Sequence, residues 1–230
     1  MKRIKLLVYF LLLTLIVVSF TPVNAQLGAT DKASFTVQNI SDSTATVTVS
    51  FITTTGTVIT PPVLNSGKSN PFDLAAGTSW EVYVPGIPSL ANGQYSVMIS
   101  STQKVVAIAN LVGEGTKNFN GSYSGFETGA ATFYLPAVVY NYYGWYSLIS
   151  VQNVGSAATD VTVSITCENG TTGTLTKSNV APNSSAHFEL KSVVPTGFTS
   201  GTKCNGSAVV TSSGQPIVAV DNQSVPAAGN

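Results

Sequence analysis

The chain has 230 residues, of which only 9% are charged, and its ten basic residues balance its ten acidic residues. Three of the basic residues precede position 26, so the remainder carries seven lysines, no arginine and a net charge of −3. Such a sparse set of cations forms no basic stripe for a phosphate backbone, and nucleic-acid binding is therefore not expected.

A secretory signal peptide is predicted at residues 1–25. Three basic residues lie within the first five positions, and an apolar run from Leu6 to Phe20 follows them. This run of about 15 residues is shorter than the roughly 20 that a membrane-spanning helix needs. Small residues then precede Gln26, so we expect a mature chain that begins at Gln26 and is secreted to the extracellular space or the cell surface. A retained membrane anchor is the alternative.

The rest of the sequence contains two copies of one pattern. Three segments of the first half return in the second half: 34–40 as 148–154, 45–51 as 159–165, and 97–110 as 209–222. The first two pairs are 114 positions apart and the third pair is 112 apart. A period of this length indicates duplicated domains rather than a solenoid.

The first domain is predicted to span residues 26–112. Apolar residues alternate in it with Ser, Thr and Gln, which is the pattern of half-buried strands. Strands are expected around 35–37, 47–51, 57–60, 79–84, 95–100 and 105–111. Proline, glycine and asparagine mark the turns between them.

A glycine-rich linker is predicted at 113–131, and a second domain at 132–230. The strands expected in the second domain are 148–153, 161–166, 186–190, 207–211 and 217–221. Short, evenly spaced strands favour an antiparallel sandwich in each copy. The predicted fold is therefore all-β, with two tandem immunoglobulin-like β-sandwich domains after a cleaved signal peptide.

The segment 132–146 is the most aromatic part of the chain, and nothing like it precedes the first copy. Its Tyr and Trp residues are Tyr134, Tyr140, Tyr142, Tyr143, Trp145 and Tyr146. These residue types give a large contact area at interfaces, so a subunit contact or a sugar-stacking platform is expected here. The alternative is an ordinary strand that fills the core with Phe133, Leu135, Val138 and Tyr140.

Cys167 and Cys204 are the two cysteines, and in a secreted chain a disulfide between them is expected. Six positions also fit the Asn-x-Ser/Thr acceptor pattern for glycosylation. They are Asn39, Asn120, Asn169, Asn183, Asn205 and Asn222.

Catalytic, metal and cofactor sites are not expected. His187 is the single histidine, and the alternation around it predicts that its side chain faces solvent with Glu189. The ten acids are dispersed without the pattern of a calcium loop, and two cysteines without a histidine pair do not make a zinc site. A secreted hydrolase whose carboxylates converge in space is the third-ranked reading of function.

Several motifs of the second copy resemble a known group of proteins. These are GW at 144–145, SVQNVG at 150–155, VAPNSS at 180–185, GF at 197–198, GSAVV at 206–210 and QPIVA at 215–219. They are similar to the tandem immunoglobulin-like repeats of proteins that environmental bacteria secrete or display on their surface. The resemblance implies a surface or structural role and no chemistry.

The expected function is that of an extracellular structural protein, a subunit of a filament, sheath or surface layer, or an adhesin-like module. Its expected partners are other copies of the chain or other surface proteins. The first domain lacks a counterpart of 132–146, and a missing strand exposes backbone groups that bind another strand. Residues 26–33 or 223–230 of a neighbouring copy are the predicted donors. The alternative is a carbohydrate-binding module that uses residues 140–146 to bind polysaccharide.

Overall fold

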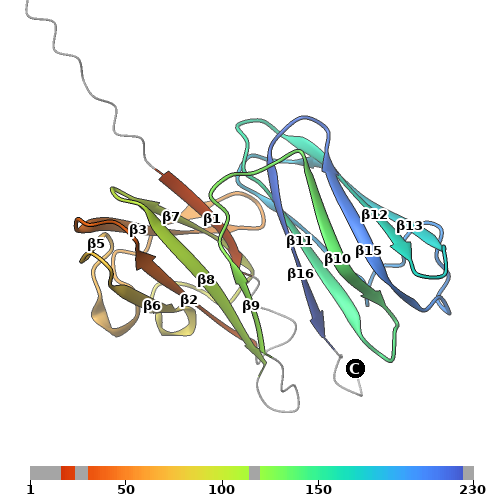
Figure 1. The fold of residues 1–230 in the computed structure, drawn as a ribbon, viewed down its shortest axis with the longest axis horizontal. Helices are drawn as coiled ribbons and strands as arrows, with labels where there is room; N and C mark the ends of the chain where they lie inside the picture. Colours follow the sequence, from red (N-terminus) through yellow and green to blue (C-terminus); the bar gives the residue numbers. More distant parts are fainter. Residues whose placement is uncertain (1–16, 24–30, 114–119, 225–230) are drawn as a thin grey trace, which may run out of the picture.

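The computed structural model describes residues 17–23, 31–113 and 120–224. They form two all-β domains that lie side by side, joined by the segment between strands β9 and β10 (Figure 1). Each domain consists of two antiparallel sheets that enclose an apolar core. The prediction of an all-β, sandwich-like fold is confirmed.

Domain 1 has two sheets, named 1A and 1B. Sheet 1A contains, in order, β1 (Val17–Val23), β7 (Tyr95–Ser101), β3 (Ala45–Thr53) and β4 (Val58–Ile59), and β5 (Phe72–Leu74) also pairs with β3. Sheet 1B contains β6 (Ser79–Tyr83), β2 (Asp31–Asn39), β8 (Val105–Gly113) and β9 (Asn120–Ser124). The loops of domain 1 contain two short 3-10 turns, η1 (Asn65–Gly67) and η2 (Val84–Gly86).

Domain 2 repeats this arrangement in its sheets 2A and 2B. Sheet 2A contains β10 (Thr132–Tyr140), β15 (Cys204–Ser212), β12 (Thr159–Cys167) and β13 (Thr172–Val180). Sheet 2B contains β14 (Ser185–Glu189), β11 (Tyr146–Asn153) and β16 (Ile217–Ser224). Sheet 2A thus corresponds to 1A, and 2B corresponds to 1B.

The same buried asparagine ends the first shared strand of both domains. Asn39 at the end of β2 and Asn153 at the end of β11 are fully buried. The side-chain amide of Asn39 donates to the carbonyls of Ser43 and Leu74 at 2.7 and 2.9 Å, and Asn153 makes the corresponding two bonds at 2.8 and 2.9 Å. Identical bonds at matched positions show that the sequence repeat is a repeat of structure.

The register of β7 and β15 differs by one residue from the match that the sequence suggested. Val49 of β3 pairs with Ile99, and Val163 of β12 pairs with Val210. Ile99 therefore corresponds to Val210 and not to Thr211. The turn after β7 spans 102–104, whereas the turn after β15 spans 213–216, and this extra residue explains the slip. The 112-residue match is right for β8 and β16 but wrong for β7 and β15, where one residue exchanges the two faces of a strand.

Four strands lie where the sequence did not predict them, and the shortest of them is β5, whose three residues pair with β3. β9 lies inside the predicted linker, and its Gly- and Ser-rich sequence lacks alternation because it only extends the edge of sheet 1B beside β8. β13 is rich in Thr, Lys and Ser on its exposed side, so its buried residues are spaced too widely to signal a strand. β1 lies inside the predicted signal peptide, where it pairs with the edge of β7.

The outer face of sheet 1A lies against the outer face of sheet 2B. The Ser96 hydroxyl of β7 is 2.5 Å from the Ser185 hydroxyl of β14. Ile52 and Val218 are fully buried on these faces, although neither belongs to the core of its own domain. β1 also lies against β11 and β16. The two domains therefore share a packed interface.

Candidate functional site

The two domains differ most at the outer edge of one strand. In domain 2, β15 pairs on its outer side with β10, which belongs to the same domain. In domain 1, β7 holds the equivalent position and pairs there with β1. Cleavage at the predicted signal site would remove β1 and leave the edge of β7 without a partner. This edge, opposite Tyr95–Ser101, is named the β7 slot.

The β7 slot is suited to an extended peptide. All seven residues of β1 pair with β7, from Val17 opposite Ser101 to Val23 opposite Tyr95. Tyr95, Val97 and Ile99 alternate along β7 and are buried in the core of domain 1. A strand in the slot therefore satisfies the backbone groups of β7 and places alternate positions over an apolar core. It also lies between the two domains, because β1 contacts both β8 and β16.

The predicted donor segments are only partly available for donation. Residues 31–33 already pair with 111–113 inside domain 1, and residues 223–224 already pair with 146–147 inside domain 2. The parts that remain, 26–30 and 225–230, lie outside the described residues.

The structure divides the predicted aromatic cluster. Tyr140 and Tyr146 pack edge to face with ring centroids 5.7 Å apart, and Tyr140 also packs on Phe198 at 5.3 Å. Tyr140 is buried in the core of domain 2, and Tyr146 packs against that core. The proposed binding role is therefore wrong for Tyr140, because its position in β10 points inward, and the core-filling alternative is right for it.

The remaining aromatic residues are accessible but do not form one platform. The turn from β10 to β11 is closed by two backbone hydrogen bonds between Tyr142 and Trp145. Tyr143 and Gly144 between them have φ values of 51° and 80°, the left-handed pair of a tight hairpin turn. This turn exposes Tyr143 and Trp145. Tyr134, which is 76% exposed, lies elsewhere, on the outer face of sheet 2A.

Trp145 lines a groove of about 600 Å³ between β9 of domain 1 and the edge of domain 2. The Asp221 carboxylate in this groove accepts hydrogen bonds at Oδ2 from Ser147 and Gln223, at 2.8 and 3.2 Å. Burial raises the pKa of Asp221 to about 6 despite these two bonds, which act to lower it. Asp221 Oδ1 and Asn222 Nδ2 have no hydrogen-bond partner among the described residues. Both atoms are buried, so the Trp145 indole is the exposed feature of the groove.

His187 does not face solvent as predicted. It is half-buried because the outer face of sheet 2B packs against domain 1, and burial lowers its pKa to about 4. Its Nδ1 lies 3.1 Å from the Ser150 hydroxyl. Ser150 is almost completely buried, so this pair is closed to a substrate. The geometry supports no nucleophilic chemistry at His187.

The disulfide between Cys167 and Cys204 is confirmed. Its Cα atoms are 5.1 Å apart, and it joins the end of β12 to the start of the neighbouring strand β15. Disulfides persist in oxidising compartments, which agrees with the predicted location outside the cytoplasm.

The glycosylation candidates fall into distinct environments. Asn39 is wrong as an acceptor, because it is fully buried and its amide nitrogen is used in two hydrogen bonds. Asn169 is exposed in the turn between β12 and β13, where its Oδ1 accepts a bond from the Thr171 amide at 3.0 Å. Three other candidates are half-buried, namely Asn183, Asn205 and Asn222, and the side chain of Asn120 lies outside the described residues.

No protein-family model, curated protein or solved structure matches the chain. Within the ranges that the structure describes, no group of His, Cys, Asp or Glu is arranged to hold a metal ion. The same ranges contain no helix with the length and apolar character needed to cross a membrane. The function must therefore be inferred from the β7 slot, the Trp145 groove and the exposed faces of the sheets.

Proposed function

We propose that the protein is an extracellular structural subunit with two immunoglobulin-like domains, which assembles into a filament, sheath or surface layer by strand donation. The observation that carries this proposal is the origin of β1. Domain 2 completes sheet 2A with its own β10, whereas domain 1 completes sheet 1A with a segment of the predicted signal peptide. A chain that begins at Gln26 needs another strand in the β7 slot.

The physical drive for assembly is the cost of an open sandwich edge. Without β1, the outer N–H and C=O groups of β7 lose their partners along the strand that carries the core residues Val97 and Ile99. A strand from another copy restores both the hydrogen bonds and the burial. The donor and the acceptor are different parts of the chain, so the contact is heterologous and extends into an open polymer unless it closes into a ring.

The direct test compares a chain that begins at Gln26 with one that begins at Val17 and keeps β1. We expect polymers of the shorter chain by negative-stain microscopy and light scattering, and monomers of the longer chain, because β1 fills the slot from within. Equal size distributions for the two chains would contradict strand donation into the β7 slot.

Two truncations of the shorter chain then identify the donor. Deletion of 26–30 and, separately, of 225–230 leaves both domains as described and removes one candidate arm each. We expect one of the two deletions to abolish polymers. If both truncated chains assemble as the parent does, the donor is not a terminal arm.

Polysaccharide binding is a second candidate function, and the Trp145 groove favours it. An indole face stacks on sugar rings, and the groove places the 40% exposed Trp145 beside Ser122 and Gln223. Trp145→Ala should abolish retention on immobilised polysaccharide, whereas Tyr143→Ala, on the same turn but not in the groove, should leave it unchanged. Equal retention of both variants would exclude the groove as the site of polysaccharide binding.

A further inference from the structure

The interface inside the chain uses one face of each domain and leaves the two corresponding faces uncovered. Within the chain, the outer face of 1A packs on the outer face of 2B. Because 2A corresponds to 1A and 2B corresponds to 1B, the unused pair is the outer face of 2A and the outer face of 1B.

The uncovered face of 1B carries the same kind of residues as the covered face of 2B. Gln38 pairs with Val106 on one side and Ser79 on the other, as Gln152 pairs with Val218 and Ser185. One step along, Ile108 corresponds to Val220, because they pair with Thr36 and Ser150.

The exposure of these apolar positions differs between the domains. Val218 and Val220 are 0% and 6% exposed, whereas Val106 and Ile108 are 40% and 42% exposed. The sequence is apolar at four consecutive positions in both strands, 105–108 and 217–220, and this is the pattern of a strand buried on both faces. β16 meets that expectation, but β8 is buried on one face only.

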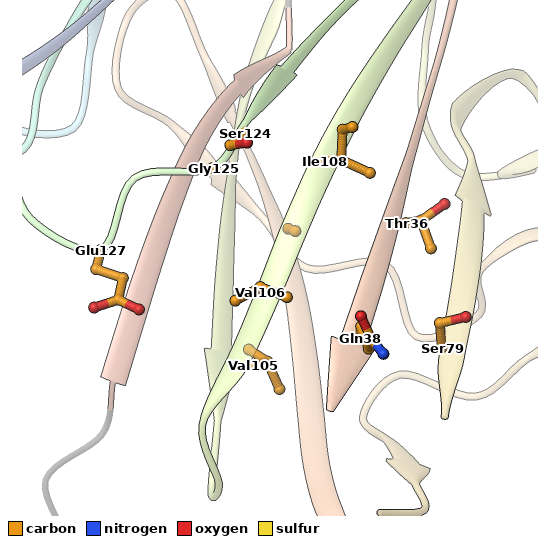
Figure 2. A pocket seen from close by; sticks show the side chains of 10 residues that line it. Thr36, Gln38, Ser79, Val105, Val106, Ile108, Ser124, Gly125 and Glu127 are labelled. Atoms are coloured by element: carbon orange, nitrogen blue, oxygen red, sulfur yellow. The ribbon is translucent and has the colours of Figure 1, made fainter. Parts of the chain in front are cut away.

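A groove marks the exposed face of 1B. Its volume is about 460 Å³, and Val106, Ile108, Thr36 and Gln38 lie along it on the adjacent strands β8 and β2 (Figure 2). Its lining is an apolar stripe beside hydroxyl and amide groups, as on the face of 2B that domain 1 covers, and it also includes the Glu127 side chain.

The outer face of 2A matches the outer face of 1A at several positions, although Thr166 stands where 1A has the buried Ile52. Ser207 pairs with Thr166 as Ser96 pairs with Ile52, so Ser207 is the counterpart of Ser96. By the same register, Val209 is the counterpart of Met98. Tyr134 pairs with Val209 at the position that β1 occupies beside Met98, and it is 76% exposed.

We infer that the outer face of sheet 1B in one copy packs on the outer face of sheet 2A in a second copy, in the geometry that joins 2B to 1A within each chain. Ile108 and Val106 then lie against Val209 and Tyr134. The hydroxyls of Ser79 and Ser207, both exposed in the monomer, meet as those of Ser185 and Ser96 do within the chain.

This contact has a consequence for the polymer. It joins two different faces, so it extends into an open row unless it closes into a ring, and domain 1 and domain 2 alternate along that row. The inference rests on the proposed function and adds a second contact to it, since strand donation fills the edge of β7 while this contact covers the faces of the sheets.

Cysteine cross-linking tests the contact directly. Ser96→Cys with Ser185→Cys in one chain is the positive control and should give an intramolecular disulfide, since the native hydroxyls are 2.5 Å apart. A mixture of one chain with Ser79→Cys and another with Ser207→Cys should give cross-linked dimers under mild oxidation. If this mixture gives no more dimer than either variant alone, while the control closes, the inferred contact is wrong.

A charge substitution separates this inference from strand donation. Ile108→Lys should shorten the polymers or abolish them, whereas Val194→Lys, a similarly exposed position in the loop after β14, should have no effect. Polymers that persist in Ile108→Lys but vanish when the donor arm is deleted would overturn the face contact and leave strand donation standing. If the Ser79→Cys and Ser207→Cys chains cross-link but the arm deletions have no effect on the polymers, the face contact stands and strand donation by the terminal arms is overturned.

Discussion

Domain 2 draws every strand of its two sheets from one continuous stretch of the chain, 132–224, whereas domain 1 needs seven residues that precede the predicted cleavage site. The two domains share the order of their central strands and the buried asparagine at the end of the first shared strand, although 1B has the additional edge strand β9 and 1A has the short strands β4 and β5 where 2A has β13. A sandwich that supplies its own edge strand is self-contained, whereas one whose edge strand can be removed is able to accept a strand from another chain.

The disulfide is the second difference between the domains. It joins two neighbouring strands of sheet 2A, and no cysteine is present in domain 1 to make an equivalent bond. Domain 2 therefore has a covalent cross-link and a complete set of strands, whereas domain 1 has no cross-link and would lack its edge strand after cleavage at the predicted signal site. Each domain carries one tryptophan, Trp80 or Trp145, so the two can be followed separately by fluorescence.

Removal of the disulfide is expected to have the largest effect on this comparison. Cys167→Ala with Cys204→Ala should lower the free energy of unfolding of domain 2 by about 3–4 kcal/mol, from the entropy of an open 37-residue loop. Denaturant unfolding followed at Trp145, in a Trp80→Phe background, measures this change. The transition of domain 1, followed at Trp80 in a Trp145→Phe background, should stay in place, and an equal shift of both transitions would show that the domains unfold as one unit.

The buried asparagines give a matched pair of substitutions. Asn39→Ala and Asn153→Ala each remove donors to two carbonyls, and each should destabilise its own domain by about 2–3 kcal/mol. Separate melting of the two domains measures both effects. Asn169→Ala on the exposed turn is the control and should change stability by less than about 0.5 kcal/mol. A loss at only one of the two buried positions would contradict their structural equivalence.

The pH dependence of domain 2 should differ from that of domain 1 because of Asp221. Its pKa is raised to about 6 in the fold from 3.8, so the protonated carboxyl is the better fit to its site. Its favourable contribution is complete below pH 3.8 and is lost as the pH rises through 6. Asp221→Asn should therefore stabilise domain 2 by about 2 kcal/mol at pH 7.5 and have little effect at pH 4.

His187 has the opposite dependence and supplies the control. Its pKa is lowered to about 4 in the fold, so stability is complete above 6.5 and is lost as the pH falls toward 4. The slopes of Asp221 and His187 oppose each other between these values. We therefore expect the Asp221→Asn variant to lose stability in domain 2 as the pH falls from 6.5 toward 4, and the added substitution His187→Gln to remove this loss. If the stability of Asp221→Asn does not change over this pH range, the lowered pKa of His187 is refuted.

The sequence predicted correctly those features of the fold that depend on local alternation, residue spacing and residue type. Alternating residues around Val49 and Val163 predicted strands. Two cysteines in a chain with a predicted signal sequence predicted the disulfide, and the repeat predicted two domains of one kind. It failed where pairing depends on distant neighbours. β9 gains its partner only because β8 lies beside it, and the face of β7 that points inward depends on the length of the turn that follows.

The candidate sites were less predictable than the fold. Exposure separates Tyr143 from Tyr140, three residues apart, and only the tertiary structure decides which of them reaches solvent. A signal for the interface between the domains was nevertheless present. The four consecutive apolar residues at 217–220 predict burial on both faces of β16, and reading them in this way would have placed His187 beside a covered face rather than in solvent.

Hydrogen exchange on β7 and β15 tests the central claim most directly. In a chain that begins at Gln26 and is kept monomeric by deletion of the donor arm, the amides of β7 that point toward the slot should exchange at least tenfold faster than the matched amides of β15, which bond to β10. A synthetic peptide with the sequence of residues 17–23 should restore their protection and leave β15 unchanged. Equal protection of β7 and β15 in that monomer without the peptide would contradict the account, because domain 1 would then be complete without a donated strand.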